Sequence, residues 1–102
     1  LKEFAYMLVI EDAETKKQLL KQKIHASMDT QFISKIGSII WTLDSPLSTW
    51  SLTFYDKDTE QGLKQRWAAC LYEIGSERRF NELNPYDQQM VIESYQLDDV
   101  KG

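Results

Sequence analysis

The sequence is poor in residues that form crosslinks or bind transition metals. Among its 102 residues, Cys70 is the only cysteine and His25 the only histidine. An internal disulfide and a metal site of several thiolates are therefore excluded, and a reducing compartment such as the cytoplasm fits best. Cys70 lies within the apolar segment "WAACLYEI", where we expect a buried and unreactive thiol. We expect no cofactor.

Long apolar runs and an excess of basic residues are also missing. No uninterrupted apolar segment approaches the roughly 20 residues that span a bilayer, and no signal-peptide pattern is present, so we expect no membrane contact. The net charge is −4, and residues 31–102 supply all of it. Without a basic face, nucleic-acid binding is disfavoured. The acidic surplus is compatible with a basic protein partner or with self-association.

The remaining composition is that of an ordinary globular domain. Hydrophobic residues make up 42% and charged residues 27% of the chain. A chain of this length has room for one hydrophobic core. We therefore predict a single domain over residues 1–97 and a flexible tail over residues 98–102, without repeats or low-complexity tracts.

The first third of the chain predicts a strand followed by a helix. Residues 4–10 are aromatic and β-branched, which is typical of a strand. Residues 12–28 are rich in helix formers, and Leu20, Ile24 and Met28 are spaced to share one helix face. We expect a helix over residues 12–28, with its lysines in solvent.

Residues 32–55 fit two patterns. Apolar side chains alternate from Ile39 to Leu43 and again from Trp50 to Phe54, on either side of the turn sequence "DSPLST". This alternation predicts a hairpin that pairs residues 37–43 with residues 49–55. A helix over residues 30–44 is the open alternative, because the apolar residues from Phe32 to Leu43 also fit a helical stripe.

The last part of the chain predicts helices. Residues 58–75 carry an apolar stripe that includes Trp67 and Leu71. Asp58 is the expected N-cap, with Gln61 completing a capping box, and Gly75 is the expected residue after the helix. Residues 76–83 suggest a short helical turn. A helix over residues 84–97 begins with Asn84, Pro85 and Asp87, and we expect Met90 and Val91 to face inward; a strand over residues 89–97 is the alternative.

These elements predict an α+β fold, in which a small, mainly antiparallel sheet packs on helices in the order β-α-β-β-α-α. An all-α bundle is the alternative if residues 30–44 and 1–10 are helical. A ferredoxin-like order, β-α-β-β-α-β, is the third choice and requires a strand at residues 89–97.

The segment Asp56-Lys57-Asp58-Thr59 is the most distinctive motif. Preceded by an apolar strand, this Asp-x-Asp-x-Thr pattern resembles the first motif of the haloacid-dehalogenase-type phosphatases. The resemblance implies Asp56 as nucleophile, Asp58 as general acid and base, and Thr59 as phosphate ligand, beside Mg²⁺. That fold requires a parallel sheet built largely after the motif, whereas the residues after Thr59 favour helices. A calcium loop starting at Asp56 also fails, because its twelfth position is Trp67.

The sequence favours a binding role over catalysis. We predict a non-enzymatic protein-binding domain, such as a small acidic regulatory, inhibitor or immunity-type protein, or a subunit of a larger assembly. The basic residues Lys64, Arg66, Arg78 and Arg79 are expected on a solvated, salt-bridged face. The alternative is a metal-dependent phosphoryl-transfer or metal-binding domain that uses Asp56 and Asp58. The candidate partner-binding residues are aromatic: Trp41, Trp50, Tyr55, Tyr86 and Tyr95.

Overall fold

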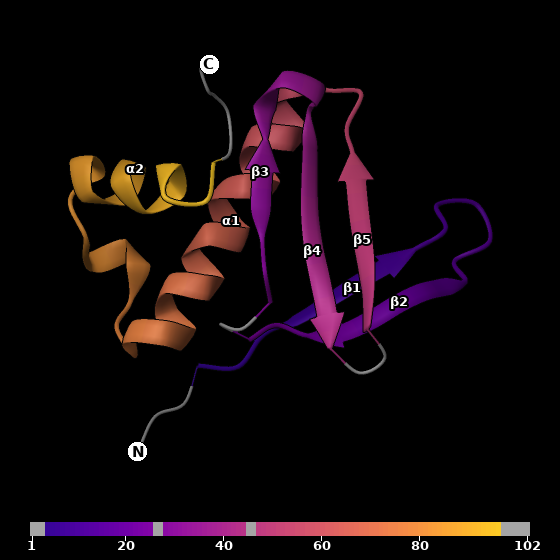
Figure 1. Cartoon of the computed structure of the whole chain (residues 1–102), viewed down its shortest axis with the longest axis horizontal. Helices are drawn as coiled ribbons and strands as arrows, with labels where there is room; N and C mark the ends of the chain where they lie inside the picture. Colours follow the sequence, from indigo (N-terminus) through magenta and orange to yellow (C-terminus); the bar gives the residue numbers. More distant parts are fainter. Residues whose placement is uncertain (1–3, 26–27, 45–46, 97–102) are drawn as a thin grey trace.

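The computed structural model describes residues 4–25, 28–44 and 47–96. It contains two antiparallel sheets and two α-helices, which confirms the α+β class and excludes the all-α and ferredoxin-like alternatives (Figure 1). The elements in chain order are β1 (Met7–Glu11), β2 (Gln18–Lys23), β3 (Gln31–Ile33), the 3₁₀ turn η1 (Ser34–Ile36), β4 (Ser38–Asp44), β5 (Leu47–Thr53), α1 (Lys57–Ser76), the 3₁₀ turn η2 (Phe80–Glu82) and α2 (Pro85–Glu93).

The helix predicted over residues 12–28 is wrong, because this segment forms a turn and then β2. The Asp12 carboxylate accepts hydrogen bonds from the backbone N–H groups of Glu14 and Thr15, both at 2.9 Å. Lys16 has a φ of 63°, in the left-handed region that an α-helix does not tolerate. The turn therefore reverses the chain and lets β2 pair with β1 along its whole length.

Residue spacing explains the error. Leu20 and Ile24 lie four positions apart, which places them on one face of a helix but also on one face of a strand. In the structure, Leu20 is half-buried and Ile24 is buried, while the lysines between them face solvent. Pairing with β1 and burial of this alternate set thus outweigh the helix propensity of the lysines and glutamines.

The predicted central hairpin is confirmed. β4 pairs with β5 in the register Ile39 with Leu52 and Trp41 with Trp50, so both alternating apolar sets lie on one face. The helical alternative for residues 30–44 is wrong. β3 pairs with β4, and η1 between them ends at Gly37, whose φ of 64° suits a glycine.

Helix α1 follows β5 and extends past the predicted range of residues 58–75 at both ends. Its N-cap is Asp56 and not Asp58: the Asp56 carboxylate accepts from the Thr59 N–H at 2.9 Å and from the Thr59 hydroxyl at 2.7 Å. At the other end the helix continues through Gly75, and Glu77 adopts the left-handed conformation with a φ of 59°. The Glu77 N–H bonds to the Glu73 carbonyl at 2.8 Å, which closes the last turn.

Helix α2 is confirmed at its N-terminus, where the Asn84 side chain accepts from the Asp87 N–H at 2.7 Å. The strand alternative fails because residues 89–93 are helical, and only an isolated bridge joins Gln96 to Phe32. Met90 faces solvent, against expectation, and the half-buried Val91 packs against the core. The predicted tail lies outside the described residues.

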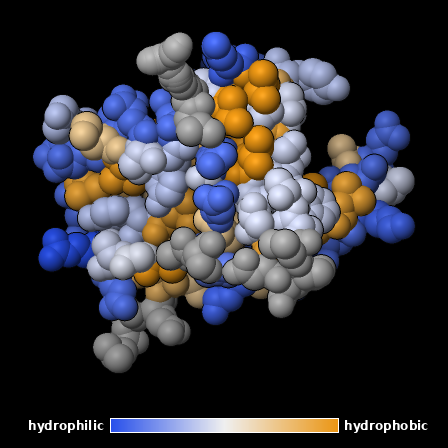
Figure 2. All heavy atoms as spheres, viewed as in Figure 1, coloured by the Kyte–Doolittle hydropathy of each residue, from blue (hydrophilic) through white to orange (hydrophobic). Residues whose placement is uncertain are grey.

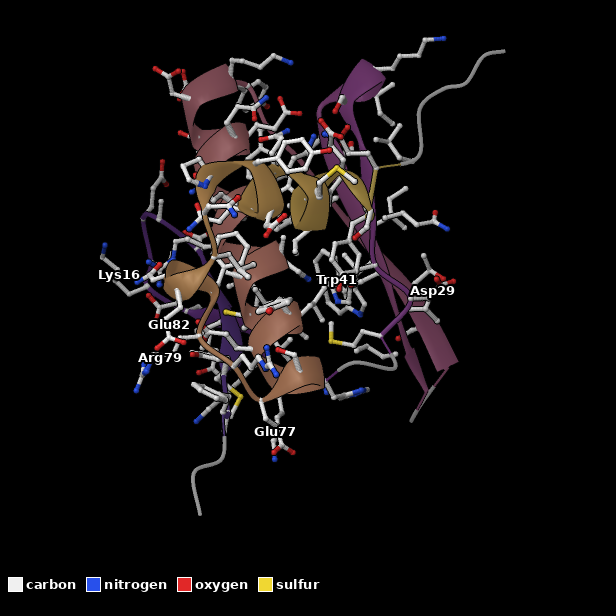
Figure 3. All side chains as sticks on the ribbon, turned by 90° about the vertical axis from the view of Figure 1, so that its left-hand side faces the viewer. Lys16, Asp29, Trp41, Glu77, Arg79 and Glu82 are labelled. Carbon is white, nitrogen blue, oxygen red and sulfur yellow. The ribbon has the colours of Figure 1, made fainter. Side chains whose placement is uncertain are left out.

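The core lies between the three-stranded sheet and α1. Trp41 is fully buried, and Figure 3 shows it between these two layers. Its ring stacks against Trp50 at a centroid distance of 6.3 Å and lies 4.9 Å from Trp67 on α1. Phe32 and Ile39 are also fully buried. Burial of Trp67 and Leu71 confirms the apolar stripe predicted for α1.

A buried ion pair lies within α1, and its lysine also bonds to the 3₁₀ turn before β4. The Lys64 ammonium donates to the Glu60 carboxylate at 2.5 Å and to the Ser34 hydroxyl at 3.3 Å. Lys64 and Glu60 are almost completely buried. Lys64 is therefore not part of a solvated basic face, whereas Arg66, Arg78 and Arg79 are exposed. The hydrogen bond from Lys64 lowers the pKa of Glu60.

Candidate protein-binding surface

The aromatic residues predicted to bind a partner do not form one site. Trp41 is fully buried, and Trp50 beside it is half-buried. Tyr95 is half-buried and packs against Phe32 at a centroid distance of 5.8 Å. Tyr55 and Tyr86 are exposed, the first between β5 and α1 and the second on α2. The exposed parts of these aromatic side chains therefore lie on separate elements and do not form one patch.

Exposed apolar side chains gather instead on the β1–β2 hairpin. Met7, Val9 and Leu19 have exposed fractions of 52%, 46% and 55%. Successive residues of a strand point to opposite faces, so these three share the outer face, while Leu8 is buried on the inner face. An exposed apolar cluster on paired strands is a candidate contact surface.

Lysines border this apolar cluster. Lys21 lies directly opposite Val9 and Lys23 opposite Met7 in the antiparallel register, and both lysines are exposed. We call these five residues, Met7, Val9, Leu19, Lys21 and Lys23, the hairpin surface. The hairpin projects beyond the three-stranded sheet in Figure 1, and Figure 2 shows apolar atoms beside strongly hydrophilic ones on this projection. Figure 3 shows that Lys16, at the turn, points away from the body of the molecule.

A second exposed surface, of opposite charge, lies on α2. Tyr86 and Met90 have exposed fractions of 72% and 50%, and their spacing of four residues places them on one side of the helix. The acidic residues Asp87 and Glu93 on the same helix are exposed. We call these four residues the α2 surface. It includes one of the predicted binding residues, Tyr86.

Sequence reasoning missed the hairpin surface because it assigned residues 12–28 to a helix. The strand pattern is nevertheless present. Leu20, Gln22 and Ile24 alternate with Leu19, Lys21 and Lys23, and the preceding Asp12 is typical of a turn. The alternation therefore carries the signal that would have placed one leucine and two lysines on a single exposed face.

A small cavity lies between the start of β1 and the C-terminal half of α1. It measures about 230 Å³, and its lining includes Tyr6, Arg66 and Cys70. The Tyr6 hydroxyl donates to the Glu73 carboxylate, which raises the pKa of Tyr6 to about 12, and the same carboxylate accepts from the Phe80 N–H at 2.8 Å. Burial raises the pKa of the Cys70 thiol, so the thiol is protonated at neutral pH and is a poor nucleophile.

The two aspartates of the phosphatase-like motif are both exposed. The Asp56 carboxylate is engaged by the hydroxyl and the N–H of Thr59, and these bonds lower its pKa. Asp58 lies in the first turn of α1. In residues 4–25, 28–44 and 47–96, no three side chains of histidine, cysteine, aspartate or glutamate form a group that could hold a metal ion. Neither helix described is long and apolar enough to cross a bilayer.

Comparison with known protein families identifies a match. The family model described as "VID27 PH-like domain" matches residues 1–74, which cover both sheets and nearly all of α1. Searches of curated proteins and of solved structures find no significant match.

Proposed function

Because this chain belongs to the VID27 PH-like domain family, we propose that it acts as a non-enzymatic protein-binding domain. In this role it is a regulatory or inhibitory module, or a subunit of a larger assembly. The observation that carries the proposal is the hairpin surface, where exposed apolar side chains lie beside lysines on two paired strands.

The chemistry of the hairpin surface defines the partner. Burying Met7, Val9 and Leu19 removes apolar area from water, which stabilises a complex by about 25 cal/mol per Å² of apolar surface. Lys21 and Lys23 favour a partner that presents carboxylates around an apolar centre, and charges at the border of an interface chiefly set specificity and association rate. The partner that fits is therefore an acidic protein surface.

The α2 surface supports a different partner. Its apolar pair is smaller, and Asp87 and Glu93 favour basic residues, in line with the basic partner expected from the net charge of the chain. The two surfaces lie on different elements and carry opposite charge. Each therefore serves as a control for the other in a binding experiment.

The test begins with the purified chain immobilised and exposed to native lysate, with captured proteins crosslinked and identified by mass spectrometry. The strongest candidate is then purified and its affinity measured by calorimetry. We expect Val9→Asp combined with Lys21→Glu to weaken binding at least tenfold, because the variant removes an apolar contact and reverses a charge. Tyr86→Ala, on the α2 surface, is expected to leave the affinity within twofold of the wild type.

Two results would contradict the proposal. One is a partner whose affinity falls with Tyr86→Ala and not with the hairpin variant. The other is sedimentation of the chain with phosphatidylserine vesicles, lost in the hairpin variant, when no protein partner binds that surface. Circular dichroism of each variant checks that the fold is retained.

A further inference from the structure

A second cavity lies between the two-stranded sheet and the middle of α1. It measures about 140 Å³ and is partly open to solvent. Its lining shares Tyr6, Arg66 and Cys70 with the larger cavity described above, so the two are adjoining parts of one cleft between β1 and α1. The other residues of its lining are apolar: Met7, Leu8, Ile24, Leu63 and Trp67.

The two walls of this cavity follow from regular structure. The α1 wall consists of residues at positions i, i+3, i+4 and i+7, which share one face of a helix: Leu63, Arg66, Trp67 and Cys70. On the opposite side, the Ile24 N–H donates to the Tyr6 carbonyl at 2.9 Å, which continues the pairing of β1 with β2. Both walls are therefore held by backbone hydrogen bonds, and the cavity is formed before any ligand binds.

The floor of the cavity is apolar and its mouth carries a positive charge. Leu8, Ile24 and Trp67 are buried, so they form the floor. Met7 and Arg66 are exposed and lie at the mouth. Among the eight described residues of the lining, Arg66 alone is charged at neutral pH. A ligand that fits has an apolar group and, next to it, an anion.

The acid that lines the larger cavity beside Arg66 is engaged elsewhere. The Glu73 carboxylate accepts hydrogen bonds from the Tyr6 hydroxyl and from the Phe80 N–H, the latter at 2.8 Å. The guanidinium of Arg66 presents a planar fork of N–H donors, whose geometry matches a carboxylate. A carboxylate at the mouth of the smaller cavity would therefore find a suitable donor in Arg66.

The volume of the cavity indicates the size of its occupant. An apolar cavity of about 150 Å³ holds one benzene-sized ring. A cavity of about 140 Å³ therefore has room for one side chain of the size of phenylalanine or leucine. Met7 belongs both to this lining and to the hairpin surface, so a protein bound to the hairpin surface can reach the cavity. Protein interfaces concentrate binding energy on anchor side chains that fill such pockets.

We propose that this cavity receives one apolar side chain of the protein partner, of the size of phenylalanine or leucine, and that Arg66 pairs with a carboxylate beside that side chain. The inference rests on the proposed function and makes it more specific. An acidic surface alone would not be sufficient for binding. The partner must present an apolar anchor next to an aspartate, a glutamate or a terminal carboxylate.

The test uses phenylpropionate, which carries a ring and a carboxylate, as a substitute for the anchor. Phenylpropanol keeps the ring without the charge, and butyrate keeps the carboxylate without the ring. Backbone amide shifts of the isotope-labelled, purified chain are followed by nuclear magnetic resonance during each titration. We expect saturable shifts in residues 6–8 and 63–70 with phenylpropionate, at least threefold weaker binding of phenylpropanol, and no saturation with butyrate.

Two pairs of variants separate the apolar contact from the charged one. Cys70→Met places a larger and flexible side chain in the cavity and should weaken phenylpropionate binding at least fivefold, whereas Cys70→Ala keeps the space and should stay within twofold. Arg66→Gln should weaken phenylpropionate at least threefold and leave phenylpropanol unchanged. Arg78→Gln, at an exposed arginine outside the lining, should change neither affinity. Circular dichroism checks that each variant is folded.

The partner captured through the hairpin surface provides the second part of the test. Phenylpropionate should compete with it, and Cys70→Met and Arg66→Gln should each weaken it at least fivefold. A partner that the hairpin variant weakens and both cavity variants leave unchanged would overturn this inference and leave the proposed function intact.

Three further results would count against the inference. Shifts that do not saturate, or that lie away from the lining, would overturn the cavity as a binding site. Equal affinities for phenylpropionate and phenylpropanol would overturn the role of Arg66. A chain that binds phenylpropionate with the expected selectivity but captures no protein would refute both the proposed function and the proposed occupant, and would assign the cavity to a small carboxylate ligand.

Discussion

Glu60 and Lys64 hold two opposite charges in the interior, and each depends on the other. Replacing Lys64 with Met leaves the Glu60 carboxylate buried without its main partner. We expect Lys64→Met to lower the free energy of unfolding by about 3–5 kcal/mol, measured by urea denaturation. The matched control is Lys57→Met: Lys57 lies 3.5 Å from the same carboxylate but is exposed, so its loss should change stability by less than about 1 kcal/mol. Equal effects for the two lysines would contradict the buried pair.

The same pair makes stability depend on pH. The pKa of Glu60 is lower in the folded chain than its unfolded value of about 4.3, because Lys64 donates to the charged form. A lowered folded pKa contributes stability above the unfolded pKa, and this contribution is lost as the pH falls through the folded pKa. We expect Glu60→Gln to reduce the loss of stability below about pH 4. Unfolding curves between pH 6 and pH 2 measure this, and identical slopes for the two proteins would refute it.

Asp56 has a structural role as the cap of α1. We expect Asp56→Ala to lower the free energy of unfolding by about 0.5–2 kcal/mol, while Asp56→Asn, which keeps a capping oxygen, should have a smaller effect. Millimolar Mg²⁺ or Ca²⁺ should leave the melting temperature of the wild type unchanged. A metal-induced rise that Asp56→Asn abolishes would instead support the phosphoryl-transfer or metal-binding alternative.

At the scale of elements, the two glycines inside α1 and the glycine of the turn before β4 should respond in opposite ways to replacement by alanine. Gly62 and Gly75 lie inside α1, and an added Cβ would meet no atom within 4 Å. We expect Gly62→Ala and Gly75→Ala each to raise the free energy of unfolding by about 0.5–1 kcal/mol. Gly37→Ala should lower it, because its φ is 64° and its Cβ would lie 3.4 Å from the Glu60 carboxylate. Thermal unfolding of the three variants checks this, and stabilisation by Gly37→Ala would be inconsistent with the structure of the turn.

The elements differ in how well their sequences predict them. α1 was predictable from its apolar stripe and α2 from its capping sequence at Asn84 and Pro85, although Asp58 was preferred to Asp56 as the cap of α1. The choice failed because Thr59 can donate from its hydroxyl as well as its N–H to Asp56, which spacing alone does not reveal. β4 and β5 were predictable because Trp41 and Trp50 alternate with polar residues on both sides of a turn.

β2 was not predictable from propensity, because its stability comes from β1. Glutamine and lysine favour a helix locally, and only pairing with residues 7–11 and burial of Leu20 and Ile24 make the strand the better conformation. Because β2 was not predicted, the hairpin surface was not predicted either. The ion pair between Glu60 and Lys64 was recognisable as a spacing of four residues, but its burial depends on η1, which packs against α1 from a distant part of the chain.

At the scale of the whole molecule, the charge is segregated among surfaces. The lysines of the hairpin surface and the acids of the α2 surface lie on elements far apart in sequence, although the chain as a whole is acidic. The match to the VID27 PH-like domain family ends at Ile74, so the α2 surface lies outside the matched region, whereas the hairpin surface lies inside it. Of the two surfaces, the hairpin surface is therefore the one that lies within the family domain.

Hydrogen exchange of the chain with and without its purified partner tests the central claim most directly. We predict slower exchange on binding in residues 7–11 and 18–23, with little change in residues 85–93. Protection confined to residues 85–93, with unchanged exchange in the hairpin, would contradict it.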